Sequence, residues 1–153
     1  MADSRVPSGP LVKVRLTDGS HQETLWAEDL GHGQYRLDNQ PWYAYDVSCG
    51  DIVEACAMHL GAIPDFVRVV ERSGNRTVRV ITQERVLPEG SNHPVLRHLR
   101  SLGCEYEGSN GKFFAVTIPP GVDLLLVRDY LIGTGLQWEH ADPSFETLFP
   151  GES

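Results

Sequence analysis

The sequence FVRVVERSGNRTVRVIT at residues 66–82 decides how the chain divides. In both arms, 66–71 and 77–82, β-branched residues alternate with charged ones, which is the period of a half-buried strand. Between the arms lie Ser73-Gly74-Asn75-Arg76, where Gly and Asn tolerate the positive φ of a tight reversal. The pattern therefore predicts a β-hairpin closed by residues 73–76.

Upstream of this segment the sequence consists of short apolar runs separated by turns. Residues 11–16 alternate apolar and basic side chains, and Asp18-Gly19 ends that run. Further strands are predicted at 23–28, 34–37, 42–47 and 52–55. Because no helical period occurs among them, residues 11–76 are predicted to form a β-rich, barrel-like half.

Downstream of residue 77 the pattern changes to strand, helix, strand, strand, helix, strand. Ser91 or Asn92 is expected to cap a helix that ends near Leu102, and Asp123 a second helix that Gly133 terminates. This order is that of a ferredoxin-like βαββαβ unit, predicted over residues 77–140. The predicted fold class is therefore α+β, with a small N-terminal β-barrel-like half joined to a C-terminal ferredoxin-like half.

The two ends of the chain are predicted to behave differently. Residues 1–10 hold two prolines and little apolar content, so we expect a flexible N-terminus. Residues 141–153 form an acidic tail that also carries Phe145, Leu148 and Phe149. We expect those apolar side chains to dock back on the sheet, in preference to serving as a partner-binding motif.

Composition and net charge indicate the cellular location and the classes of partner to expect. The net charge is −8 and the pI is near 5.1, a balance that repels phosphate backbones, so no nucleic acid is expected as a partner. Three cysteines lack the even pattern of a secreted disulfide scaffold, which favours a cytoplasmic location. No apolar run approaches the roughly 20 residues of a membrane span, so no membrane association is expected.

No local signature assigns a catalytic residue, and whether the protein is an enzyme stays open. Cys49 lies at a turn where a thiol nucleophile could be exposed, but an incidental thiol is the alternative. Asp46, Asp51, Glu54 and His140 are candidates for acid–base chemistry, although a carboxylate at a turn more often caps backbone N–H groups. Without a C-x-x-C pair or H-x-x-x-H motif, neither a metal nor a cofactor is expected.

The aromatic segment Trp42-Tyr43-Ala44-Tyr45 gives the strongest indication of binding. Alternation sends Tyr43 and Tyr45 to one face. If that face lies open beside Arg36, Arg72 and Arg76, it offers stacking surface, hydroxyls and positive charge to an anionic or peptide ligand, whereas plain packing is the alternative. The candidate ligand-binding residues are Arg36, Trp42, Tyr43, Tyr45, Asp46, Cys49, Asp51, Ser73, Asn75 and Arg76.

Several stretches between Val12 and Glu139 carry a resemblance to a known family. They include Leu25-Trp26-Ala27-Glu28, Ser48-x-Gly50-Asp51-x-Val53-Glu54-Ala55 and Leu102-Gly103-Cys104-x-Tyr106-Glu107-Gly108. The pattern resembles the bacterial family known as domain of unknown function forty-two sixty-five. The resemblance implies a small bacterial cytosolic protein with no established activity, so it transfers no catalytic role. Members often have histidine where this chain has Asn75, so this turn is not expected to supply an essential imidazole.

The expected function is that of a binding or regulatory module. It would recognise a peptide, a protein partner or a small anionic ligand through residues 42–46 and the turn at 73–76. The alternatives are a small accessory enzyme of specialised metabolism, with Asp46, Cys49 or Asp51 in a cleft between the halves, and a toxin-neutralising immunity protein. A homodimer through the open sheet face is a further alternative. The binding hypothesis requires a polar, partly aromatic hollow at the seam between the two halves.

Overall fold

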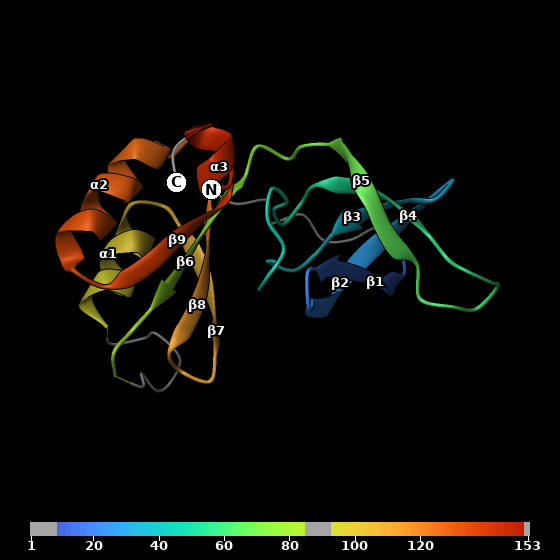
Figure 1. The fold of residues 1–153 in the computed structure, drawn as a ribbon, viewed down its shortest axis with the longest axis horizontal. Helices are drawn as coiled ribbons and strands as arrows, with labels where there is room; N and C mark the ends of the chain where they lie inside the picture. The colour runs from blue at the N-terminus through green and yellow to red at the C-terminus, as the bar shows by residue number, and fades with distance from the viewer. Residues whose placement is uncertain (1–8, 85–92, 152–153) are drawn as a thin grey trace.

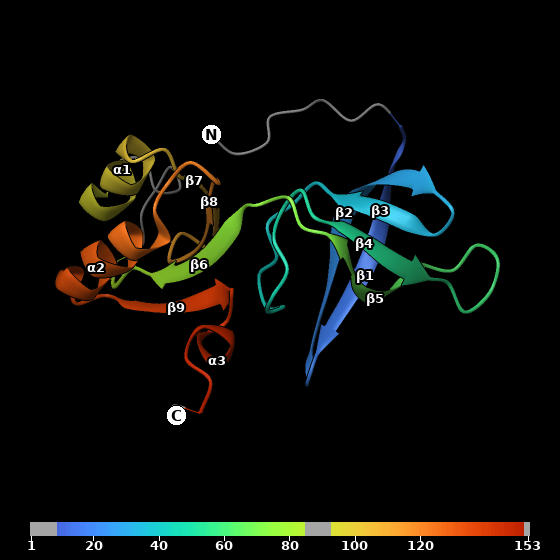
Figure 2. The same cartoon turned by 90° about the horizontal axis from the view of Figure 1, so that it is seen from above.

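The computed structural model describes residues 9–84 and 93–151, which form a closed five-stranded barrel and a four-stranded sheet backed by helices (Figure 1). The predicted α+β class with an N-terminal barrel is thereby confirmed. The two parts lie side by side, and the chain crosses between them in the extended segment that follows the last barrel strand (Figure 2). Among the described residues, no helix has the length and apolar character required to cross a bilayer.

The barrel is an antiparallel meander whose first and last strands meet. Its strands are β1 (Leu11–Asp18), β2 (His21–Gly31), β3 (Gln34–Leu37), β4 (Ile52–Cys56) and β5 (Asp65–Glu71). Arg15 on β1 pairs in parallel with Asp65 on β5 and closes the barrel, and their side chains form an ion pair with an N–O distance of 2.6 Å. Alternate residues such as Val14, Leu25 and Val53 fill the interior, as the period of two requires.

The predicted hairpin over residues 66–82 is wrong. β5 pairs with β4 and β1, whereas β6 (Arg76–Ile81) pairs with β8 and β9 in the other sheet. The two arms part because each finds its own core: Val69 packs in the barrel, and Val80 packs under the helices. The turn at 73–76 is thus a crossing between the two parts, and Arg76 already belongs to the sheet.

The second sheet has the strand order β7-β8-β6-β9, and every neighbouring pair is antiparallel. Along the chain, β6 is followed by α1 (Pro94–Ser101), β7 (Glu105–Ser109), β8 (Phe113–Ile118), α2 (Leu124–Thr134) and β9 (Gln137–Asp142). Both helices cover one face of the sheet (Figure 1). Their buried residues Leu96, Leu99, Val127 and Leu131 pack with Val78, Val80, Phe114, Val116 and Ile118 of the strands.

The helix ends differ in part from the sequence prediction. His93 caps α1, and its Nδ1 accepts a hydrogen bond from the backbone N–H of Val95 at 3.2 Å, while the predicted caps Ser91 and Asn92 lie outside the described residues. Asp123 caps α2 as predicted. The helix continues past Gly133 and ends at Gly135, whose φ of 75° is the left-handed conformation that terminates helices.

The C-terminal tail begins later than predicted and packs on the fold. Strand β9 runs to Asp142, because its ladder with β6 continues to Thr77, so the expected boundary at residue 141 is wrong. The short helix α3 (Phe145–Leu148) follows, and the ring of Phe149 lies 6.3 Å from that of His140. Phe149 therefore packs against β9 as expected, whereas Phe145 is 44% exposed and no residue of α3 is buried. Most of the expected flexible N-terminus, residues 1–8, lies outside the described residues.

Candidate functional site

The segment between β3 and β4, residues 38–51, lies across the face of the sheet that the helices leave uncovered. Arg79 on this face is 2% exposed, and its guanidinium donates to the backbone carbonyls of Tyr43 and Pro41, each at 3.3 Å, and to that of Ala44. Gln40 Nε2 donates to Thr117 Oγ1 at 2.6 Å. Residues 38–51, which we call the linker, therefore cover much of the sheet face that the homodimer alternative would use.

The aromatic part of the linker is a turn and not the predicted strand over 42–47. The buried carboxylate of Glu23 accepts hydrogen bonds from three consecutive backbone N–H groups, those of Trp42, Tyr43 and Ala44, at 2.7 to 2.9 Å. One carboxylate can bind three successive N–H groups only where the backbone curls around it. Tyr43 and Tyr45 still point outward, and each is 44% exposed.

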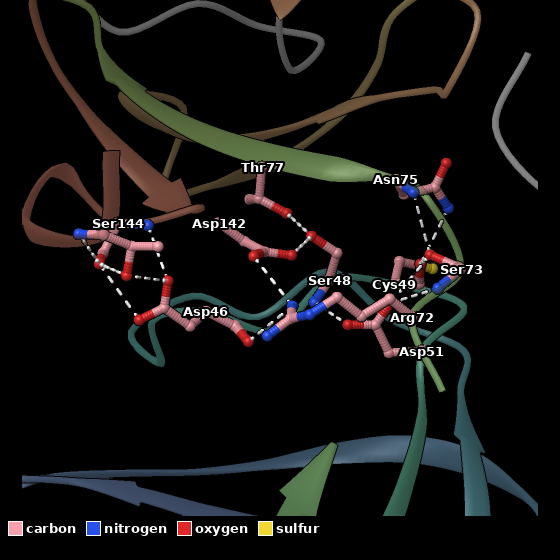
Figure 3. Close-up of polar contacts among 11 residues, drawn as sticks. Asp46, Ser48, Cys49, Asp51, Arg72, Ser73, Asn75, Thr77, Asp142 and Ser144 are labelled. Atoms are coloured by element: carbon pink, nitrogen blue, oxygen red, sulfur yellow. Dashed lines mark hydrogen bonds and ion pairs between the residues drawn. The ribbon is translucent and has the colours of Figure 1, made fainter. Parts of the chain in front are cut away.

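A buried polar network joins the linker to the sheet (Figure 3). Ser48, which is fully buried, donates to Asp142 Oδ2 at 2.5 Å and shares a hydrogen bond with Thr77 Oγ1 at 2.7 Å. Arg72 donates to Asp142 Oδ1 at 3.3 Å and to the backbone carbonyl of Asp46 at 3.2 Å. Burial raises the pKa of Asp142, although the Ser48 hydrogen bond and the Arg72 charge act in the opposite direction.

Asp51 holds the crossing between barrel and sheet. Its carboxylate is fully buried and accepts from the backbone N–H of Ser48 at 3.0 Å and of Ser73 at 2.8 Å. The carbonyl of Cys49 accepts from Ser73 Oγ at 3.1 Å and from Asn75 Nδ2 at 2.9 Å. The predicted site residues Cys49, Asp51, Ser73 and Asn75 therefore do come together. They form a framework of hydrogen bonds in which Asp51 caps backbone N–H groups.

Asp46 connects the linker to the C-terminal helix. The Asp46 carboxylate accepts from the backbone N–H of Ser144 at 2.8 Å, from Ser144 Oγ at 3.1 Å and from Thr147 Oγ1 at 3.1 Å. The Asp46 N–H in turn donates to the carbonyl of Ala141 at 2.7 Å. The linker and α3 are therefore held together on one side of β9.

A hollow of about 660 Å³ opens beside this connection, at the seam where the hypothesis required one. Its wall is acidic and partly aromatic. The Tyr45 hydroxyl donates to Glu139 Oε1 at 2.7 Å, which is the main reason that the pKa of Tyr45 is raised, and the Tyr45 ring lies 5.1 Å from the Arg79 guanidinium. The lining residues are Asp18, Tyr45, Asp46, Glu139, His140, Ser144, Phe145 and Glu146.

A second hollow of about 360 Å³ lies on the helix side of β9. Glu139, His140 and Phe145 line both hollows, and Arg128, Ile132 and Trp138 complete the second one. The His140 side chain is only 6% exposed, and neither ring nitrogen has a hydrogen-bond partner within the described residues. Burial lowers the pKa of His140, and the charge of Arg128 lowers it further. The ring is therefore held in an environment that favours its neutral form.

The remaining predicted site residues lie elsewhere. Arg36 forms an ion pair with Glu28 on the barrel at 3.0 Å, and Arg76 donates to the carbonyls of Pro119 and Val122. The Trp42 ring packs near Phe113, and the Tyr43 ring stacks on His21. Arg36 and Arg76 thus have partners other than the tyrosines, whereas Arg72, the third arginine expected beside them, donates to the backbone carbonyl of Asp46.

Sequence reasoning missed three important residues, Arg79, Glu139 and Phe145, and considered His140 for acid–base chemistry only. In the alternating β6 sequence Arg79 has the pattern of a solvent-facing charge. It is buried because the linker, some 35 residues earlier in the chain, supplies carbonyl partners. No local sequence pattern predicts that Arg79 binds the carbonyls of the linker.

The fold and its seam define an α+β protein in which a closed barrel packs against a helix-backed sheet through a polar linker that belongs to the barrel half. The chain belongs to the family described as Domain of unknown function (DUF4265), whose model matches residues 23–140. This match confirms the resemblance seen in the sequence. A comparison with curated proteins gave no match.

Among solved structures, the chain is similar to a hypothetical protein from Neisseria gonorrhoeae known from a crystal structure. The TM-score is 0.71 at 16% sequence identity, and the similarity covers 89% of this chain and 97% of the other. At this identity the likeness concerns the fold alone.

Proposed function

We propose that the protein is a binding module that recognises a peptide or protein segment bearing a basic side chain in the hollow of about 660 Å³. The charge of the wall carries this proposal. Four carboxylates line the hollow, those of Asp18, Asp46, Glu139 and Glu146, and neither Lys nor Arg is among its described lining residues. Arg79 pairs with Glu139 from outside this lining at 3.2 Å, so the excess negative charge comes from Asp18, Asp46 and Glu146. A wall with an excess of one charge attracts a ligand of the opposite sign.

The same charges argue against the small anionic ligand that the sequence suggested. Two of the arginines expected to bind it, Arg36 and Arg76, are engaged with Glu28 and with backbone carbonyls. Tyr45 remains a suitable contact, because its half-exposed ring offers an aromatic face to a cation. His140 adds a buried polar group whose nitrogens have no partner in the described chain, which is rare in native proteins.

The bonding of Asp46, Cys49 and Asp51 supports a framework role over the enzyme alternative. The Asp51 carboxylate is fully buried and accepts from the backbone N–H groups of Ser48 and Ser73, and the Cys49 carbonyl accepts from Asn75. Asp46 does line the hollow, but its carboxylate accepts from Ser144 and Thr147 of the C-terminal segment. A toxin-neutralising role would be a special case of protein recognition. Copurification with one tight partner would distinguish it.

We also propose the fold of the second half, the cellular location and the type of partner that the sequence suggested. The strand order β7-β8-β6-β9, with both helices on one face, supports a ferredoxin-like assignment for the second half. The absence of a disulfide among the described cysteines 49, 56 and 104 supports a reducing, cytoplasmic location, and the Neisseria neighbour supports a bacterial origin. The net charge of −8 supports the absence of nucleic acid among the partners.

A peptide array with isothermal titration calorimetry tests the proposal. We expect capped peptides containing Lys or Arg to bind, with an affinity that falls as salt is raised. Glu146→Lys should weaken binding by about tenfold or more, because it reverses a lining charge. Glu105→Lys, an exposed residue of β7 away from the hollow, is the matched control and should have no effect. Selection of acidic peptides, or equal effects of the two variants, would overturn the proposal.

A further inference from the structure

Strand β9 has an unpaired outer edge bordered by hollows. It is the last strand of the sheet, and β6 is its one strand partner within the described chain. At its C-terminal end the Ala141 carbonyl is bound by the Asp46 N–H. Over residues 137–140 the described chain shows no further backbone bonding beyond the ladder with β6. This short stretch is open to an added strand.

Each residue of this stretch lines at least one hollow. A third hollow, of about 270 Å³, is lined by Gln137, Trp138 and Glu139 together with Arg79, Ile81 and Phe113. The two hollows described above involve Trp138, Glu139 and His140. The side chains of an added strand could therefore enter hollows on the helix side and on the barrel side of this edge.

We propose that the partner segment binds in an extended conformation as an additional strand on the outer edge of β9. This inference rests on the proposed function and specifies the form of the ligand. Backbone groups of residues 137–140 would supply main-chain hydrogen bonds, and hollows on both faces would receive alternate side chains. The recognised segment is a β-strand and not a helix or a folded surface.

The two faces select different side chains. On the helix side, Ile132, Trp138 and Phe145 offer apolar surface, and Ile132 is 54% exposed. On the barrel side, Asp18 and Glu146 offer negative charge, whereas Glu139 is already paired with Arg79. Since successive residues of a strand point to opposite faces, the segment should alternate apolar and basic residues. His140 lies in the wall shared by both hollows and is only 6% exposed. Its ring nitrogens have no hydrogen-bond partner within the described chain, so a ligand group beside the ring would supply one.

The test uses a capped heptapeptide of alternating Lys and Leu as the probe, with isothermal titration calorimetry. Two derivatives carry backbone N-methyl groups, one on every Lys and one on every Leu. A strand bonds to a neighbouring edge through the N–H groups of alternate residues only. We expect one methylation pattern to weaken binding by about tenfold or more and the other to change it little. Equal effects of both patterns would overturn the edge pairing and leave the proposed function standing.

A block peptide and two protein variants provide the second test. A peptide of the same composition with all Lys before all Leu should bind more weakly than the alternating one, and equal binding would contradict the inference. Ile132→Lys should abolish this preference, because it places charge in the apolar hollow. Leu125→Lys is the matched control, since Leu125 is 57% exposed on the same helix and lines none of these hollows, and it should preserve the preference. If no Lys peptide binds at any salt concentration, the proposed function itself fails.

Discussion

Ser48 of the linker and Asp142 of β9 lie 94 residues apart in sequence, and the Ser48 hydroxyl donates to the Asp142 carboxylate over 2.5 Å. Both side chains are buried, and Arg72 from the crossing segment reaches the same carboxylate. Three separate parts of the chain therefore meet at one acidic group. The protonation of that group should affect how firmly barrel and sheet hold together.

Asp142 gives the first prediction. Because burial raises its folded-state pKa above the ordinary 3.8, the folded protein binds its proton more tightly than the unfolded chain does. The stability of the wild type relative to Asp142→Asn should therefore fall as pH rises from about 3.8 through the raised pKa, and stay constant above it. Urea denaturation at several pH values measures this difference. A relative stability that rises with pH over the same window would show that the Arg72 charge outweighs burial.

Arg79 gives the second prediction. Arg79→Met removes the donor to three linker carbonyls and to Glu139, and it leaves those buried carbonyls without a partner. We expect a loss of about 3 kcal/mol in the free energy of unfolding, together with faster hydrogen exchange in the linker. Arg97→Met, at an exposed position on α1, is the control and should change stability by no more than about 0.5 kcal/mol. Similar losses for both variants would contradict the role assigned to Arg79.

Gly74 gives the third prediction. Its φ is 93°, and an added Cβ would lie 2.9 Å from Pro120 Cγ. Gly61 has a φ of 87° but no atom within 4 Å of such a Cβ. Gly74→Ala and Gly61→Ala therefore share the backbone strain, and only the first adds a clash. Thermal or urea denaturation should show Gly74→Ala to be less stable by about 1 kcal/mol or more, whereas equal losses would rule out the contact with Pro120.

The cysteines give the fourth prediction. Burial raises the pKa of the Cys104 thiol to about 11, so about one molecule in a thousand carries the reactive thiolate at pH 8. Cys56 is exposed. Iodoacetamide at pH 8, followed by mass spectrometry of peptides, should label Cys56 long before Cys104, and urea should remove the difference. Comparable labelling of both in the native protein would contradict the burial of Cys104.

The sequence predicted the elements of this fold better than their partners. Alternation at residues 66–71 and 77–82 correctly indicated two strands, because that pattern depends only on which side of each strand is buried. It could not indicate that β5 and β6 enter different sheets, since pairing depends on which core receives each apolar face. The strand predicted at 42–47 failed for a similar reason, because Glu23, a residue from another strand, curls that backbone.

The candidate site was predictable to the same extent. Tyr45 and Asp46 were proposed from a local aromatic and acidic cluster, and they do line the hollow at the seam. Glu139 and His140 lie in a strand where alternation alone assigns one to solvent and the other to the core. Their relation to Tyr45 exists only because β9 ends beside the linker, a contact between segments 94 residues apart.

The position of the linker also makes the sheet dependent on the barrel half of the chain. Residues 40–48 lie within the barrel portion of the chain, yet they supply the bonding partners of Arg79 and Thr117 in the sheet. A gene fragment encoding the sheet alone would express a protein with a charged, unsatisfied surface in place of an interior. Barrel and sheet are therefore expected to unfold together in one cooperative transition, since the sheet keeps a satisfied interior only with these barrel residues in place.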